Sequence, residues 1–454
     1  MVSRVCSWLP LKKAFPWLLV GMGILFYCFN YFLRVSPGMI QNSLIQNFHI
    51  TATQLGGLVG LYYWAYTPMQ IPAGMLYDKY GVRFVLCGAS LIAVVGLALF
   101  TAASDYMFAS YGRFLIGLGC AFAYIGTLKI ASIWLPANQF GTVAGLTTAF
   151  GMLSGTLSQR FLTQLTQTLN YQDIFHVAIL IGIALSVMIL IVMRNKPANP
   201  NKVVPANNTD TPINMNQLFT ALRVVARNKQ MWLIGTIGCL LYLPSSVFLD
   251  LWGMPYLKTV YRISQSQAVT IQSCIFYGWI IAGPVLGIIS DKIIKRRVLP
   301  LMFTGFFAAL LLCGVFYVPN IPIAYLYPIF FTIGFCCGAH SLTFALGKEN
   351  NPIQISGTAV ATTNALIMVG GAIFQPLVGI LLDLHTVSPI DASGLPVYTA
   401  SDYVFALSIV PIGVALGIFL SLFLKETYCK SQAKAEDEAV FKPMRLKPKA
   451  ETAH

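Results

Sequence analysis

The residues of this chain that could do chemistry are charged side chains inside long apolar stretches. Arg34 and Asp250 lie 250 − 34 = 216 residues apart, and Phe32-Leu33 before Arg34 matches Phe248-Leu249 before Asp250. A charge at the centre of an apolar membrane helix costs about 2.5–3.5 kcal/mol on insertion scales, so it indicates a function. We expect the two side chains to pair near the outer side and to close it. The alternative is that each reaches the nearer membrane surface alone.

Asp250 is also the first candidate for carrying a proton. A carboxylate beside an arginine changes its affinity for a proton when the arginine moves away. His340 is the second candidate, because imidazole titrates near neutral pH. The competing interpretation of His340, a hydrogen-bonded packing residue, is the one we prefer.

Three cationic side chains of the first half, Arg34, Arg113 and Lys129, would make a cavity there electropositive. Such a cavity favours a ligand with a carboxylate or another anionic group. Alternatively, Arg113 bonds carbonyls of a neighbouring helix and Lys129 reaches the aqueous surface. Polar and aromatic residues of the same stretches could complete the ligand site, although most such aromatics pack or anchor helices: Tyr27, Asn30, Tyr62, Tyr66, Gln70, Tyr124, Tyr277, Trp279, Asn364 and Gln375.

The composition predicts an integral membrane protein. Of 454 residues, 57% are hydrophobic and 10% are charged, whereas soluble domains carry about 25% charged residues. The ten cysteines show no CxxC pair and no metal-ligand spacing with histidine, so we expect packing roles for them. Neither a hydrolase constellation nor a phosphate-binding loop is present. We therefore expect no enzyme activity, no cofactor and no metal.

Twelve apolar runs are long enough to span a bilayer, where backbone polar groups must be satisfied within helices. Most of the 29 basic residues fall on one side of these spans, which predicts that side as cytoplasmic, with both termini there, in an inner membrane. The net charge of +14 then faces anionic lipid headgroups rather than nucleic acid. The expected spans are 15–35, 54–76, 84–103, 107–132, 140–162, 173–193, 231–256, 266–290, 299–317, 323–346, 355–382 and 403–424.

The spans divide into two halves around a polar stretch. Residues 194–230 are expected to be a flexible linker ending in a short amphipathic helix on the membrane surface. The remaining predicted segments are a cytoplasmic N-terminus at 1–14, six-helix bundles at 15–193 and 231–424, and a disordered tail at 425–454.

The two halves also repeat each other in sequence. Residues 141–159 align with 357–375, with seven identities in 19 positions, including Gln159 with Gln375. A second repeated stretch lies between helices: Gly74-Met-Leu-Tyr-Asp78-Lys79-Tyr-Gly81-Val-Arg83, with the reduced copy Gly287-Ile-Ile-Ser-Asp291-Lys292-Ile-Ile-Lys295-Arg296-Arg297. Repeats of this kind place a ligand site between the halves near the midplane.

We interpret the repeated stretch as a gate on the cytoplasmic side. Gly74 would allow close helix approach. Asp78 would pair with Lys79 or Arg83, or face another helix's N-terminus, and such contacts between halves would hold the inside closed. A tight turn with solvated charges is the alternative.

These motifs resemble the major facilitator superfamily. The stretch from Gly74 to Arg83 looks like its loop signature, and Arg113-Phe-Leu-Ile-Gly117-Leu-Gly119-Cys-Ala121 looks like its fourth-helix signature. The fifth helix lacks the Gly-Pro pair of many drug exporters. The resemblance covers about residues 15–425. It implies two six-helix bundles with pseudo-two-fold symmetry, alternating access, and a role for Arg113 in coupling or gating.

Two stretches, 26–39 and 63–72, look like the intraphagosomal nutrient and amino-acid transporter branch of that superfamily. We therefore expect a monomeric secondary transporter that imports a small carboxylate-bearing nutrient, such as an amino acid or organic anion, with protons. One alternative is an exporter of a small metabolite or siderophore-like compound. The other is a transporter-like sensor without turnover, although the tail of about 30 residues is short for a signalling domain.

Overall fold

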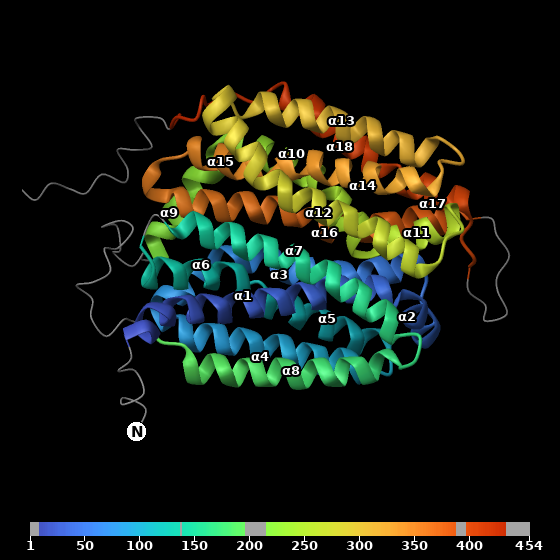
Figure 1. Cartoon of the computed structure of the whole chain (residues 1–454), viewed down its shortest axis with the longest axis horizontal. Coiled ribbons are helices and arrows are strands. Elements are labelled where there is room, and N and C mark those ends of the chain that lie inside the picture. The colour runs from blue at the N-terminus through green and yellow to red at the C-terminus, as the bar shows by residue number, and fades with distance from the viewer. Residues whose placement is uncertain (1–8, 137–138, 196–214, 387–395, 433–454) are drawn as a thin grey trace, which may run out of the picture.

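The computed structural model describes residues 9–136, 139–195, 215–386 and 396–432. Regular structure in these ranges is helical. Long helices run side by side along the longest axis of the molecule, and the first half of the chain lies beneath the second half in Figure 1. The expected disorder of the tail beyond residue 432, and the linker from 196 to 214, lie outside the described residues.

Most helices of the first half follow a polar or glycine residue that separates the apolar runs. Asp105, for example, accepts a hydrogen bond from the backbone of Phe108 and so caps the helix that starts at Tyr106. The eight helices are α1 (Leu9–Met39), α2 (Gln41–Phe48), α3 (Ala52–Tyr80), α4 (Val82–Thr101), α5 (Tyr106–Cys120), α6 (Ala123–Trp134), α7 (Phe140–Leu165) and α8 (Tyr171–Val192).

The second half starts with the short amphipathic helix that the linker predicts, and a π-helical segment, Pro244–Trp252, lies between α10 and α11. Short 3₁₀ turns at Gly338–Ser341 and Ile353–Ile355 join neighbouring helices. The helices are α9 (Met215–Arg227), α10 (Lys229–Leu243), α11 (Gly253–Val260), α12 (Gln265–Ile288), α13 (Val298–Tyr317), α14 (Ile323–Cys337), α15 (Leu342–Glu349), α16 (Ser356–His385), α17 (Ala400–Leu407) and α18 (Ile409–Ser421). A second short π-helical segment, Ile289–Ile294, extends α12.

Ten helical stretches of the described chain are long and apolar enough to cross a membrane. The two other expected spans correspond to α3 and α7, which are full-length helices of 29 and 26 residues. Both carry more polar side chains than their neighbours. Both also pack against the opposite half, α3 on α16 and α7 on α12, so each shows part of its surface to protein rather than lipid.

Besides the span that contains the π-helical segment Pro244–Trp252, three expected spans are each made of two helices in series, and one of these is α17 followed by α18. The other two breaks occupy equivalent places in the two halves. The first half breaks between α5 and α6 at Ala121-Phe122, and the second half breaks between α14 and α15 at the 3₁₀ turn Gly338–Ser341. The breaks lie 338 − 121 = 217 residues apart, close to the repeat offset. The duplication seen in sequence therefore extends to an interruption that periodicity did not predict.

The two ends of the molecule differ in how the halves meet. We call the end with α9 the linker end and the end with α2, α11 and α17 the α2 end; these lie at the left and right of Figure 1. Small residues bring α3 and α16 together towards the α2 end. A Cβ atom on Gly56 would stand 2.4 Å from the carbonyl oxygen of Gln375, and one on Gly379 would stand 2.2 Å from that of Ala52. Backbones can approach this closely only where side chains are absent.

Candidate functional site

The two charges that share the repeat offset form a buried ion pair between the halves. Arg34 on α1 donates from Nε to Oδ2 of Asp250, on the π-helical segment, at 2.8 Å. Their exposed fractions are 6% and 1%. The predicted contact is therefore present, and the alternative, in which each side chain reaches solvent alone, does not hold in this structure.

Three tyrosines surround this pair. Tyr63 on α3 donates its hydroxyl to Oδ2 of Asp250, and Arg34 donates from Nη2 to the hydroxyl of Tyr242 on α10 at 3.0 Å. The Arg34 guanidinium also lies over the rings of Tyr31, Tyr63 and Tyr242, 5.2–5.5 Å from their centroids. Aromatic faces stabilise a desolvated cation. The positive charge is therefore held by one carboxylate and three rings.

Sequence reasoning missed all three of these residues, Tyr31, Tyr63 and Tyr242. Tyr63 lies three residues before Tyr66 and seven before Gln70, both of which were candidates, so the helical spacing of that face could have identified it. No comparable pattern marks Tyr242, because its role depends on how α10 is rotated against α1.

The π-helical segment leaves backbone carbonyls that two glutamines bind. Gln159 on α7 donates to the carbonyl oxygen of Leu249 at 3.1 Å, and Gln375 on α16 donates to that of Ser246 at 2.6 Å. Both side chains are fully buried. The widened turn, which often marks functional sites in helices, thus has its freed carbonyls satisfied from both halves. Gln375 supports the backbone beside Asp250, and it offers no exposed surface to a ligand.

Arg113 lies just behind the ion pair. It is 1% exposed, and its Nη1 donates to the carbonyl oxygen of Leu33, the residue before Arg34, at 2.9 Å. Its Nε and Nη2 have no hydrogen-bond partner among the described residues. The ring of Tyr62 lies 5.4 Å from the guanidinium carbon. Arg113 thus bonds a neighbouring helix, which is the alternative interpretation given above.

His340 lies in the 3₁₀ turn between α14 and α15 and is linked to Arg34 through one aromatic ring. Its Nδ1 accepts a hydrogen bond from Nε1 of Trp279 at 3.2 Å, and its ring lies 5.1 Å from that of Tyr242. An imidazole nitrogen that accepts a hydrogen bond carries no proton, so this ring is neutral. The geometry matches the preferred interpretation of His340 as a hydrogen-bonded packing residue.

Several remaining candidates are engaged with each other. Asn364 donates to Oε1 of Gln70 at 3.1 Å across the two halves, and Gln70 donates to the carbonyl oxygen of Ala121 at 3.3 Å. Within the first half, Tyr62 donates to Oδ1 of Asn30 at 2.5 Å. The amide groups near the ion pair are therefore bound to protein groups.

The aromatic candidates separate into two groups. Tyr27 packs against Tyr31 and Tyr124 at ring distances of 5.2 and 5.3 Å, and Tyr66 stacks on Tyr62 at 5.5 Å. These rings continue, within the first half, the group of aromatic rings that surrounds Arg34. Tyr277 is half-buried on α12, and among the described residues no hydrogen bond or ring contact joins it to the ion pair.

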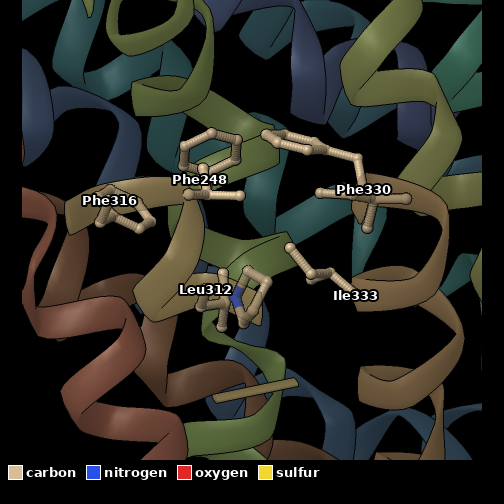
Figure 2. Close-up of a pocket in the computed structure, with 8 residues that line it drawn as sticks. Phe248, Leu312, Phe316, Phe330 and Ile333 are labelled. Carbon is tan, nitrogen blue, oxygen red and sulfur yellow. The ribbon is translucent and has the colours of Figure 1, made fainter. Parts of the chain in front are cut away.

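A small pocket within the second half is apolar. All eight side chains that line it are hydrophobic, among them Phe248, Phe330 and Leu312 (Figure 2). Phe248 precedes Asp250 by two residues. The pocket offers no hydrogen-bonding side chain, so it cannot supply the polar contacts that an anionic ligand needs.

The first copy of the repeated stretch forms its contacts within its own half. Lys129 pairs with Asp78 at 2.7 Å, with both side chains about one-third exposed. Arg83 donates from Nε to the carbonyl oxygen of Leu190 and from its backbone to Oδ1 of Asn195. The predicted partners of Asp78 were wrong: α6, three helices further on, supplies the base. Lys129 is thereby occupied by Asp78.

Three other positions of this first copy differ in their surroundings. Gly81 adopts φ 81°, a left-handed conformation that suits glycine between α3 and α4. Lys79 lies over the ring of Tyr80 at 5.0 Å. A Cβ atom on Gly74 would meet nothing within 4 Å, so the predicted close helix approach at Gly74 is wrong, because that face of α3 has no neighbour there.

The second copy is more extensively bonded. Arg297 binds Asp291, donates to Ser290 at 2.9 Å, and pairs with Glu349 at 2.8 Å. Burial lowers the pKa of the Arg297 guanidinium, but hydrogen bonds and charge from Glu349 and Asp291 outweigh this effect and raise it above its usual value. Lys292 is exposed. Arg297, rather than Lys292, is therefore the base of this network.

The first part of the tail docks on the second copy. Glu426 accepts hydrogen bonds from the backbones of Arg297 at 2.7 Å and Val298 at 3.0 Å and so caps α13. Thr427 donates to Glu349, and Cys429 donates to the carbonyl oxygen of Ser290. The expectation that the tail is disordered from residue 425 is therefore wrong for residues 426–432, which form these contacts.

At the α2 end, a carboxylate joins the two halves directly. Asp383, in the last turn of α16, accepts a hydrogen bond from the backbone of Thr53 at 2.9 Å. Tyr398 donates to Asp383 and accepts from the backbone of Ala52 at 3.1 Å. Two of the free N–H groups at the start of α3 are thus satisfied by the opposite half.

Comparison with protein families gives one match across most of the chain. A profile described as Major Facilitator Superfamily matches residues 20–375. Among solved structures, a bacterial homologue of the human lysosomal transporter Spinster, in an inward-facing, unoccupied conformation, superposes with a TM-score of 0.68 at 14% identity, covering 92% of this chain and 97% of that one. At this identity the likeness shows the fold alone.

Three similar sequences are named as transporters of organic acids. A probable sulfoacetate transporter of Cupriavidus necator is 22% identical over 62% of this chain and 66% of its own length. A probable galactarate/D-glucarate transporter of Escherichia coli is 23% identical over 81% of this chain and 86% of its own. A 3-(3-hydroxy-phenyl)propionate transporter of Escherichia coli is 24% identical over 82% and 89%. An uncharacterized transporter of Bacillus subtilis is matched over only 35% of its length.

Proposed function

Because this chain belongs to the Major Facilitator Superfamily, we propose that it imports a small organic acid together with protons by alternating access. The observation that carries the proposal is the buried pair of Arg34 and Asp250, which joins the two halves. A substrate carboxylate or sulfonate binds Arg34 in place of Asp250. Asp250, without its counter-ion, then takes up a proton. Substrate and proton are thereby bound together, because each replaces one partner of the same ion pair.

An anionic substrate fits the charges of this region better than a cationic one. Asp250 already has two strong donors, and Arg113 is a buried cation without a carboxylate partner. A zwitterionic amino acid would need a partner for its ammonium group, and Asp250 is the carboxylate nearest Arg34. The names of the three similar transporters, all for organic acids, support the anion and leave amino acids as the second candidate class.

The charge count favours one negative charge per substrate. Of the other two cations, Lys129 is paired with Asp78, and Arg113 stands behind Leu33 and Tyr62. Replacing Asp250 by one substrate anion and adding one proton leaves the net charge of the site unchanged. A second substrate charge would need another cation in this low-dielectric region. We therefore place monoanions before dianions.

The direction of the proposed transport depends on which end of the molecule faces the cytoplasm. We place the linker end and both termini in the cytoplasm of a cell with an inner membrane, on the basis of the Lys and Arg distribution. The close packing of α3 on α16 at the α2 end then supports an inward-facing interpretation. The two repeated stretches remain our candidate gates at the linker end: Gly74, Asp78, Lys79, Gly81 and Arg83 in the first copy, Asp291 and Lys292 in the second.

Uptake into proteoliposomes tests this proposal. The purified monomeric protein would be offered labelled acetate, 3-phenylpropionate, sulfoacetate, glucarate and a mixture of amino acids, with and without an inward proton gradient. We expect gradient-driven accumulation of a monoanion, its loss in Asp250→Asn, and retained counterflow exchange in that variant. Arg34→Gln should lose binding as well as accumulation.

Four outcomes would contradict the proposal. Gradient-driven accumulation that persists in Asp250→Asn removes Asp250 from proton coupling. If only amino acids accumulate, they replace organic acids as the substrate class. If solutes bind but none shows flux or exchange, a sensor is favoured. If accumulation occurs only with an outward proton gradient, an exporter is favoured.

A further inference from the structure

Both hydrogen bonds to Asp250 reach the same oxygen. Nε of Arg34 and the hydroxyl of Tyr63 each donate to Oδ2. No hydrogen bond to Oδ1 is present among the described residues. The two donors therefore fix the carboxylate through one oxygen and leave the second oxygen available.

Tyr63 is held in place by the opposite half of the molecule. It is fully buried, and a Cβ atom on Gly371 of α16 would stand 2.5 Å from its ring. Its ring also lies 5.2 Å from the guanidinium carbon of Arg34. The hydroxyl of Tyr63 is thus positioned between α16 and the ion pair, and it has little freedom to turn away.

We propose that Tyr63 is a positioning residue for the coupling site, which holds Asp250 by Oδ2 in both protonation states so that the proton binds at Oδ1. This inference rests on the proposed function. When a proton from solution forms an O–H bond at Oδ1, Oδ2 becomes the carbonyl oxygen of a carboxylic acid and still accepts from Tyr63. The bond from Arg34 to Oδ2 breaks, and the guanidinium becomes free for the substrate anion.

The physical advantage lies in the neutral state. A buried acid that loses Arg34 without another donor would leave an unsatisfied carbonyl oxygen, which is destabilising. The Tyr63 hydroxyl avoids that penalty, because a phenol can donate in the same geometry to a carboxylate oxygen and to the carbonyl oxygen of a carboxylic acid. Asp250 therefore keeps its orientation while its charge changes.

The groups facing Asp250 come from several helices. Helices α1 and α3 supply the groups that donate hydrogen bonds to Asp250. Arg113 of α5 acts through the carbonyl oxygen of Leu33, and Tyr242 of α10 acts through Arg34. Gln159 of α7 binds the neighbouring carbonyl oxygen of Leu249 and does not titrate. The titratable or charged groups are Arg34, Tyr63, Arg113, Tyr31 and Tyr242.

The test compares two buried tyrosines of α3. Tyr63→Phe removes the hydroxyl on Asp250, whereas the matched control Tyr77→Phe removes a hydroxyl that donates to the carbonyl oxygen of Phe122 at 2.8 Å. The pH dependence of proton-driven uptake is measured for both in proteoliposomes, with the substrate found by the panel above. A hydrogen bond to a charged acceptor is stronger than one to a neutral acceptor, so its loss favours protonated Asp250. We expect Tyr63→Phe to move the pH profile about one unit towards higher pH and Tyr77→Phe to leave it in place.

A second variant keeps the test decisive if Tyr63→Phe does not fold. Incorporating 3,5-difluorotyrosine at position 63 retains the ring and the hydroxyl but makes the phenol a stronger donor. We expect this variant to move the profile towards lower pH, the opposite direction. Difference infrared spectra give an independent readout: the C=O stretch of protonated Asp250, assigned by its loss in Asp250→Asn, should rise in frequency when the Tyr63 hydroxyl is absent.

The outcomes separate this inference from the proposed function. Accumulation that remains pH-dependent in Asp250→Asn overturns the proposed function itself. If Asp250→Asn abolishes that accumulation while the Tyr63 variants match the wild type, or while Tyr77→Phe shifts the profile equally, only the role of Tyr63 is overturned.

Discussion

The two ends of the molecule bind their polar groups in different ways. At the linker end, Asp78 pairs with Lys129 and Arg297 pairs with Glu349, each within its own half. At the α2 end, Asp383 and Tyr398 of the second half bind the start of α3 in the first. Contacts within a half stabilise that half in every conformation. Contacts across the halves exist in only one conformation, so they set the balance between conformations.

The two repeated stretches at the linker end also differ from each other. The stretch with the more complete sequence motif makes the fewer side-chain bonds. The first copy is complete in sequence, yet Asp78 has one partly exposed partner. The second copy is reduced, yet Arg297 collects Asp291, Ser290 and Glu349. A motif's completeness therefore does not measure its bonding, because the strongest partner, Glu349, lies outside the motif.

The largest effect is expected at Arg297. Its side chain and that of Glu349 are 9% and 13% exposed, so Arg297→Gln leaves a mostly buried carboxylate without its base. Breaking such a pair costs about 3–5 kcal/mol. Thermal unfolding of the detergent-solubilised protein should show this loss. The adjacent Arg296→Gln, which removes a contact only with the ring of Tyr428, is the control, and an equal loss in both variants would contradict the assignment.

A smaller effect of a different kind is expected at Asp383. Asp383→Ala removes the carboxylate from the N-terminus of α3, worth about 1–2 kcal/mol. That corresponds to a roughly five- to thirtyfold shift towards opening at the α2 end. Spin labels at Leu169 and Val318, both exposed on α2-end loops of opposite halves, would report the distance between halves.

The control for Asp383 is Asp105→Ala. Asp105 caps α5 at the same end but inside one half, so its loss should lower stability without changing the label distances. If both variants lengthen the distance alike, the contrast between contacts within and across halves fails.

The smallest effect is expected at Asp78. Its pair with Lys129 is about one-third exposed on both sides, and exposed pairs contribute about 0–1 kcal/mol. Asp78→Asn, Lys129→Gln and the double variant together form a double-mutant cycle measured by thermal unfolding. A coupling energy above about 2 kcal/mol would show that the first copy is bonded as strongly as the second.

Sequence reasoning predicted the contacts that the duplication encodes. The helical fold follows from apolar length, and the Arg34–Asp250 pair follows from an equal position in two repeats. Sequence reasoning could not predict contacts that depend on how a helix is rotated or on segments far apart in the chain. Tyr242 reaches Arg34 through the rotation of α10, and Glu426 and Asp383 reach helix starts 129 and 330 residues away in the chain. Such partners leave no periodic pattern, because each occurs once.

The equivalence of Arg34 and Asp250 also constrains how this molecule arose. If the halves descend from one gene, the ancestral protein was a symmetric homodimer of six-helix subunits. In such a dimer the residue at this position lies at the two-fold axis and faces its own copy. Two arginines or two aspartates there would repel each other in a low-dielectric interior. An opposite-charge pair requires the two copies to be encoded by separate sequences, so it originated after the gene was duplicated, and the proposed coupling pair is younger than the fold that holds it.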